Sequence, residues 1–277
     1  MLPERQRRSS CIGVADFGKI NGMRTPHSIL VVFCTFIALN TGAQAAESQP
    51  AMIGQGADSV AARLHYPQTA KAAKTEGAVQ FYCEVGADGR ARHVRVIAES
   101  SWSALRFTVR NAVQQGRFIP ARLNGKTTSV MIGGTVFFLM PKGQPTILVT
   151  MATADKTKAA AGRNYIQPQM LASFDDLERK MYTWRSLVTQ YSAFPSAEVM
   201  CNVDASGNLT GTKIVNESKA NSGLGAVAVK ACEGAKFVPA LDNSKPVPGQ
   251  FNLAIDFAML VNPDEMAPGS HLKQREE

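Results

Sequence analysis

Cysteine and histidine are the residue types in this chain that could bind a metal, act as nucleophiles or change redox state. After residue 45 the cysteines are Cys83, Cys201 and Cys232, with no C-x-x-C pair and no His at metal-ligand spacing. The histidines of the same stretch are scattered: His65, His93 and His271. No Ser or Cys nucleophile can be paired with a base. The sequence therefore predicts no metal, no cofactor and no enzyme activity.

One pair of cysteines is expected to meet. Cys201 lies on an alternating strand pattern, and Cys232 lies on the helix that should cover that strand. A Cys201–Cys232 disulfide is compatible with this arrangement, and the alternative is the ordinary role of cysteine as a small buried apolar residue. Because three cysteines allow at most one bridge, and Cys83 has no counterpart of Cys232, Cys83 is expected to stay free.

The elements that position these residues occur twice, about 118 residues apart. Phe81-Tyr82-Cys83-Glu84-Val85 recurs as Val199-Met200-Cys201-Asn202-Val203. Phe118-Ile119-Pro120-Ala121 recurs as Phe237-Val238-Pro239-Ala240, after one inserted residue. A repeat this long indicates two copies of a small domain, since a solenoid needs at least three shorter units.

Each copy is predicted to form strand, hairpin, strand, helix and strand. The apolar spacing places them near 79–85, around Val94, Val96 and Ala98, near 103–116 and near 130–140, and again near 198–204, 210–216, 223–235 and 250–260. We therefore expect an α+β fold of two tandem two-layer domains, each a small antiparallel β-β-α-β sheet covered by helix on one face. The crossover rule puts the third strand beside the first, at an open edge.

The N-terminal region looks like a targeting segment. Met23-Arg24 precedes the apolar run Ile29 to Leu39 and then Ala43-Gln44-Ala45, the order found in a secretory signal. The run has 11 residues, too few to span a bilayer as a helix, although an uncleaved anchor is the alternative. A cleaved signal predicts export to the bacterial periplasm. The expected organisation is an over-long gene start at 1–22, a signal at 23–45, domains at 46–145 and 166–262, a linker at 146–165 and a tail at 263–277. The second domain should begin with an extra helix, Phe174–Tyr191.

Charge is distributed unevenly between the copies. Residues 63–145 hold twelve Lys or Arg and four Asp or Glu, whereas residues 165–262 hold eight and nine. Such an excess suggests an anionic partner surface, or simply a solvated face that favours solubility. The basic surface is expected at Arg90, Arg92, Arg95 and Arg117. Nucleic acid is not expected as a partner in the periplasm.

The final strand of the first copy has apolar residues on both faces. With its inward residues facing the core, the outward positions are Met131, Gly133, Thr135, Phe137 and Leu139. Exposed apolar residues along an edge strand favour pairing with another chain. The cover could be the second copy, a second chain in a homodimer through edge strands, or a partner peptide.

An ordered series of short motifs resembles the C-terminal domain of TonB, the periplasmic energy transducer of Gram-negative bacteria. The series is Tyr66-Pro67-x-x-Ala70, Gly77-x-Val79, Val85-x-x-Asp88-Gly89, Glu99-Ser100-Ser101, Leu105, Ala112-Val113, Arg117-Phe118-x-Pro120-Ala121 and Gly125-Lys126. The second copy keeps Ser206-Gly207, Ser218, the Lys236–Ala240 segment and the terminal strand, and its assignment relies mainly on the internal repeat.

The resemblance implies a periplasmic protein–protein interaction module that adds extended peptides to an open sheet edge. Its partner would be an envelope protein or a peptide segment of a transporter. The chain has no Pro-rich spacer and its apolar segment looks cleavable, so motor coupling is not expected. The alternative is a structural envelope protein whose basic first domain binds peptidoglycan or anionic lipid.

Overall fold

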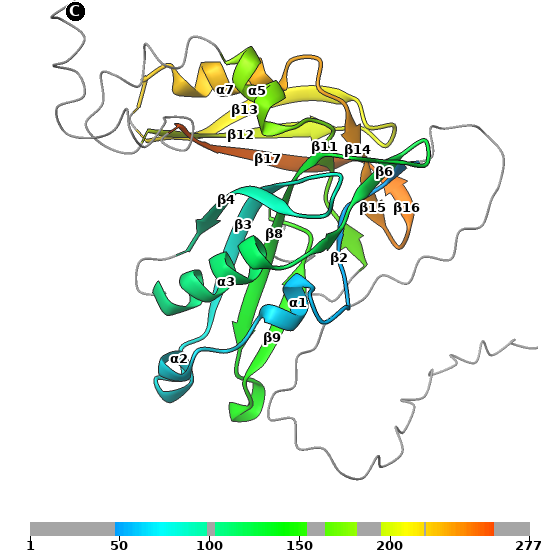
Figure 1. Cartoon of the computed structure of the whole chain (residues 1–277). Coiled ribbons are helices and arrows are strands. Elements are labelled where there is room, and N and C mark those ends of the chain that lie inside the picture. Colours follow the sequence, from blue (N-terminus) through cyan, green and yellow to red (C-terminus); the bar gives the residue numbers. More distant parts are fainter. Residues whose placement is uncertain (1–47, 99–102, 154–163, 182–194, 219, 258–277) are drawn as a thin grey trace, which may run out of the picture.

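The computed structural model describes residues 48–98, 103–153, 164–181, 195–218 and 220–257. Antiparallel sheets with few helices make up these residues, which confirms the predicted α+β class. Two sheet-and-helix layers are stacked, with the second repeat above the first in Figure 1. The N-terminal segment and the C-terminal tail lie outside the described residues.

The first repeat is a three-stranded unit with helices on one face. β3 (Gly77–Val85) lies between β4 (Ala91–Ile97) and β8 (Val130–Leu139) and is antiparallel to both, as expected. Alternate residues of β3 are buried beneath α3 (Ser103–Gln115) because the strand period is two and one face meets the helix. Two short helices precede the sheet, α1 (Val60–Arg63) and α2 (Gln68–Ala72).

The second repeat has the same order of elements. β12 (Ser196–Val203) lies between β13 (Leu209–Glu217) and β17 (Gly249–Asp256), and α7 (Leu224–Cys232) packs on one face. The helix expected from Phe174 is present as α5 (Phe174–Lys180), and the remainder of its predicted length, from residue 182 on, lies outside the described residues.

Short strands that periodicity did not predict also occur twice. β1 (Ser48–Gln49), β6 (Ala121–Leu123) and β7 (Lys126–Thr128) form a small sheet, as do β10 (Tyr165–Ile166), β15 (Ala240–Asp242) and β16 (Lys245–Val247). Likewise β2 (Met52–Ile53) pairs with β5 (Phe118–Ile119), and β11 (Gln169–Met170) pairs with β14 (Phe237–Val238). The structural repetition therefore extends beyond the predicted elements.

A glycine turn has the same role in both repeats. The N–H of Phe118 donates to Gly89 O at 2.9 Å, and the N–H of Phe237 donates to Gly207 O at 3.0 Å. Both glycines have positive φ, 76° and 81°. A Cβ on Gly207 would lie 2.2 Å from Phe237 O, so a side chain at this position is excluded by the close backbone approach as well as by φ.

The repeats are not independent units. β11 pairs with β14 and, at Met170, with Met131 of β8, giving a sheet ordered β14-β11-β8-β3-β4. The expected linker at 146–165 is also partly wrong, because β9 (Thr146–Thr150) pairs antiparallel with β8 after the short 3₁₀ turn η2 (Pro141–Gly143). The linker was predicted from composition, because the residues around this five-residue strand are of the types common in turns and linkers.

Two glutamine side chains complete the junction between the repeats. Gln169 accepts from the N–H of Ala51 at 2.7 Å and donates to Ala51 O at 2.8 Å. Gln167 accepts from the N–H of Thr153 at 2.8 Å and donates to Gly133 O at 3.3 Å. An amide side chain can satisfy one backbone donor and one acceptor, so these residues replace ladder hydrogen bonds where no strand fits.

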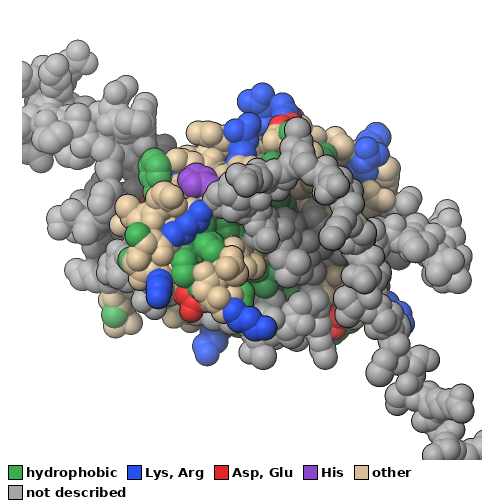
Figure 2. Space-filling model, turned by 90° about the horizontal axis from the view of Figure 1, so that it is seen from below, with side chains coloured by type: hydrophobic (Ala, Val, Ile, Leu, Met, Phe, Trp, Pro, Cys, Tyr) green, Lys and Arg blue, Asp and Glu red, His purple; other side chains and the backbone are tan. Residues whose placement is uncertain are grey.

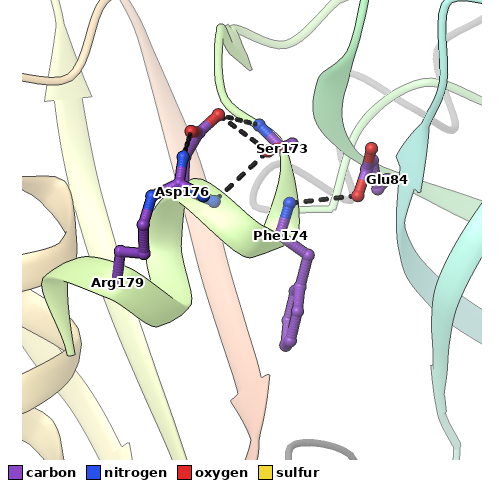
Figure 3. Close-up of polar contacts among 5 residues, drawn as sticks. All are labelled: Glu84, Ser173, Phe174, Asp176 and Arg179. Carbon is purple, nitrogen blue, oxygen red and sulfur yellow. Dashed lines mark hydrogen bonds and ion pairs between the residues drawn. The ribbon is translucent and has the colours of Figure 1, made fainter. Parts of the chain in front are cut away.

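A carboxylate of the first repeat meets the first turn of a helix of the second. Glu84 on β3 is 5% exposed and accepts from the N–H of Phe174, the first residue of α5, at 3.0 Å (Figure 3). Ser173 and Asp176 cap the same helix reciprocally, and these hydrogen bonds from Ser173 lower the pKa of Asp176. His93 of β4 stacks on the Phe174 ring at 4.0 Å.

Replacement of Glu84 should show what this contact contributes. Glu84→Ala leaves the buried N–H of Phe174 without its acceptor and should lower the free energy of unfolding by about 1–3 kcal/mol. Glu84→Gln keeps an acceptor oxygen and should lose less. Urea unfolding followed by circular dichroism measures both variants. Equal losses would mean that packing around Glu84, rather than the hydrogen bond, holds α5 in place.

Candidate functional site

The predicted peptide-binding strand lies where expected, but its edge is not open. The positions Met131, Gly133, Thr135, Phe137 and Leu139 share the face opposite the first core, whereas their neighbours Ile132, Val136 and Phe138 lie in that core. However, β9 pairs with β8 from Thr135 to Leu139, and β11 pairs with it at Met131. The expectation of an unpaired edge here is wrong because the chain folds back on itself.

The cover over this strand comes from the same chain. Thr135 is 1% exposed, and its hydroxyl donates to Ala152 O at 2.6 Å. Met131 belongs to the core of the second repeat, beside Met170 and Phe174. A Cβ on Gly133 would lie 2.7 Å from the Gln167 amide nitrogen, so the glycine leaves the space that this side chain needs. Only Phe137 and Leu139 remain half-buried.

The equivalent strand of the second repeat, β17, has a different edge. In the part of the chain that the structure describes, β17 pairs only with β12. Phe257 donates its N–H to Pro195 O at 2.9 Å. Because hydrogen-bonded and non-hydrogen-bonded pairs alternate along an antiparallel ladder, this bond determines which residues of β17 are hydrogen-bonded to β12. The backbone groups of Leu253 and Ile255 therefore point to β12, and those of Gln250, Asn252 and Ala254 point away from it.

Thr135 and Ala254 occupy matching positions in the two repeats. Thr135 pairs with Gln80 of β3, and Ala254 pairs with Glu198 of β12. Gln80 precedes Cys83 by three residues, and Glu198 precedes Cys201 by three, so the two strand positions are equivalent. β8 therefore carries an added strand at the position where β17 carries none among the described residues.

The other terminal strands of the two three-stranded units are less regular. The pairing of β13 with β12 shifts register at two places, and that of β4 with β3 shifts at one. β13 also presents an exposed lysine, Lys213, beside the exposed Ile214 and Val215. Bulges and lysines on an edge oppose the addition of another strand. The pairing of β17 with β12 has no register shift, so β17 is the best candidate edge.

The predicted basic surface is only partly present. Arg90, Arg92 and Arg117 are exposed and gather around Asp88, where Arg92 forms a 2.9 Å ion pair and Arg117 donates to the backbone oxygen at 3.1 Å. The hydrogen bond from the Arg90 backbone N–H is the main cause that lowers the pKa of Asp88, and the positive charge of Arg92 contributes less. Arg95 does not belong to this surface, because it lies on the face of β4 that meets the second repeat.

Arg95 is part of a polar cluster between the two repeats that sequence reasoning missed. Glu198 accepts from the Asn252 amide at 3.0 Å, and burial is the main cause that raises its pKa. Burial, with a smaller contribution from the Glu198 charge, raises the pKa of Tyr82 to about 12. One guanidinium nitrogen of Arg95 and the amide oxygen of Asn252 are buried without a hydrogen-bond partner. Arg95 was expected on an exposed basic surface, because strand alternation does not show that the outward faces of the two repeats meet.

The cysteines lie as the strand and helix patterns indicated. The sulfur atoms of Cys201 and Cys232 are 3.3 Å apart, and both residues are fully buried as thiols. Cys83 is also fully buried, and burial raises its pKa. No cluster of three or more His, Cys, Asp or Glu that could hold a metal occurs within the described ranges. Over those same ranges, no helix has the length and apolar character needed to span a membrane.

An oxidising compartment should link Cys201 to Cys232 and leave Cys83 reduced. Closing a loop of this size would stabilise the fold by about 3–4 kcal/mol in the chain-entropy model. Peptide mapping by mass spectrometry without reductant should find the Cys201–Cys232 bridge, with Cys83 alkylated only after unfolding. A bridge between Cys83 and Cys201 would contradict the structure, in which these residues belong to separate cores.

Stability should depend on pH through Glu198. Burial raises its folded-state pKa above the unfolded value of about 4.3, so the associated stabilisation is complete below that pH and is lost as pH rises through the folded pKa. Glu198→Gln is neutral at every pH and keeps an acceptor for Asn252. It should therefore raise the urea midpoint at pH 7, with the difference shrinking toward pH 4. A lower midpoint at pH 7 would show that attraction to Arg95 outweighs burial.

The first repeat matches a known family. Residues 62–139 match the family described as Gram-negative bacterial TonB protein C-terminal. The matched segment begins within α1 and ends at the last residue of β8, so it excludes β9 and the second repeat. No curated protein is similar enough to this chain to count as a relative. The chain therefore contains, in its first repeat, a domain of the Gram-negative TonB C-terminal family.

Proposed function

We propose that this protein is a periplasmic interaction module that binds an extended segment of an envelope protein as an added strand on the outer edge of β17. Domains of the matched family are non-enzymatic and interact with envelope proteins such as transporters. The second repeat is, in this proposal, a divergent copy of the same domain. Motor coupling is not part of the proposed activity.

The pairing of β9 with β8 is the observation that carries the proposal. Five consecutive pairs join them, from Thr135 with Thr150 to Leu139 with Thr146. β9 follows the family-matched segment and adds to its last strand in the antiparallel sense. The last strand of this domain type can thus accept an extended segment, with backbone hydrogen bonds providing the affinity.

The second repeat supplies an equivalent strand without an equivalent partner in the described residues. At the offset that relates Thr135 to Ala254, the apolar segment Thr146–Thr150 corresponds to residues 265–269, where the sequence Glu-Met-Ala-Pro-Gly contains Pro268 and Gly269, which disfavour a strand. A segment from another protein is therefore the expected occupant.

A proline at position 254 tests this assignment. The N–H of Ala254 points away from β12, so Ala254→Pro removes one donor from the free edge and spares the β12 ladder. Ala254→Val keeps the donor and serves as the matched control. Immobilised protein should capture its partner from envelope extract with the valine variant and lose it with the proline variant. Capture should change little between low and high salt, because strand addition does not depend on charge.

Two results would contradict strand addition at β17. Equal capture by the proline and valine variants, both folded by circular dichroism, would show that this edge is not used. Capture that is unaffected by the proline and abolished by salt would favour the alternative of a structural envelope protein with an electrostatic contact. Thr135→Pro is unsuitable as a test, because β8 is paired on both sides and the variant should unfold.

A further inference from the structure

The helical layer of the first repeat carries an excess of positive charge, with the exposed acids Asp58 and Glu76 directly beside the segment of α1 and α2. Neither the segment with α1 and α2, residues 59–75, nor α3 contains an Asp or Glu. The cations of these segments are Arg63, Lys71, Lys74, Arg106 and Arg110, of which Lys71 is half-buried and the rest are exposed. Five cations beside two acids leave a net positive charge, which attracts an anionic surface more strongly than the balanced charges of an ordinary solvated face.

Phe107 stands in the middle of this charge. It is 65% exposed, whereas the other exposed large hydrophobic residues among those described reach at most 46%. Phe107 borders a hollow of about 520 Å³ between α2 and α3, together with Tyr66, Pro67 and Lys71. Figure 2 shows hydrophobic side chains open to solvent on this side of the molecule, with more Lys and Arg than Asp and Glu around them. An exposed aromatic among cations marks an interaction surface.

We propose that this surface binds the face of an anionic phospholipid bilayer, with Phe107 entering the headgroup region. Each lysine or arginine near an anionic membrane adds attraction, and an aromatic residue gains by leaving water at the interface. An extended peptide fits the surface less well, since the backbone groups of α1, α2 and α3 are used within helices and offer no ladder. The proposal does not depend on strand addition at β17.

The test places a fluorescent residue at the contact. Phe107→Trp is compared with Val215→Trp, at a 45% exposed position of the second repeat, in the full chain with Trp102 and Trp184 unchanged. With vesicles of phosphatidylcholine and 30% brominated phosphatidylglycerol, Phe107→Trp should show a blue shift and quenching beyond those of the parent chain. Val215→Trp should not, and pure phosphatidylcholine should give neither effect. Residues 29–39 are unchanged in every variant, so any membrane binding by this apolar run contributes equally to all the signals that are compared.

Charge reversal gives the second arm of the experiment. At low salt, Arg106→Glu with Arg110→Glu should reduce partitioning onto the anionic vesicles by on the order of several hundredfold, at about fivefold for each of the four charge units changed. Arg122→Glu with Lys126→Glu, two exposed cations of the β6–β7 hairpin, is the matched control and should cause a much smaller loss.

Three results would overturn the proposal. One is the absence of a lipid-charge-dependent signal at position 107 in a folded variant. Another is an equal loss of partitioning for the two charge-reversed pairs. A signal produced by polyglutamate or by self-association on sedimentation, without one on vesicles, would assign the surface to an acidic protein or a second copy instead.

Discussion

The two-sided pairing of β8 is the constraint on which the rest of the structure depends. Along one edge β8 is hydrogen-bonded to β3, and along the other it meets β9 and then β11. Through β11 it reaches β14, so one strand connects the sheet of the first repeat with a strand of the second. Removing an interior strand would leave backbone groups of three neighbours unpaired and buried, which makes the two repeats one cooperative structure.

The long, periodic helices and strands could be predicted from the sequence. The short strands and the packing of one repeat on the other could not. β3, α3, β12 and α7 each show a regular spacing of apolar residues over at least two turns or four alternations, and they lie within a few residues of their predicted bounds. Two-residue strands such as β2 and β11 have no periodicity to detect. Their positions follow from pairing with residues far along the chain.

The face of Arg95 illustrates the same limit at the candidate site. Strand alternation correctly placed this side chain opposite the core of its own repeat, but alternation contains no information on what meets that face. The result is a predicted surface residue that lies in a polar junction with Glu198. For β8, the face on which Thr135 lies was predicted correctly. The pairing of β8 with β9 was not predicted, because β9 lies in a segment with the composition of a linker. β17 then becomes the better candidate edge through comparison of the two repeats.

The contact between Gln169 and Ala51 affects the order in which the molecule can be assembled. Ala51 lies among the first residues that the structure describes, yet its backbone N–H and C=O are satisfied by a side chain 118 residues later in the chain. During synthesis or export from the N-terminus, this contact must therefore wait until residue 169, beyond the whole of the first repeat, is available. Contacts between residues so far apart in the sequence slow folding, because the chain loses the entropy of closing the loop before the contact contributes any stabilisation. The segment around Ala51 thus reaches its final place only after the chain of the first repeat is complete.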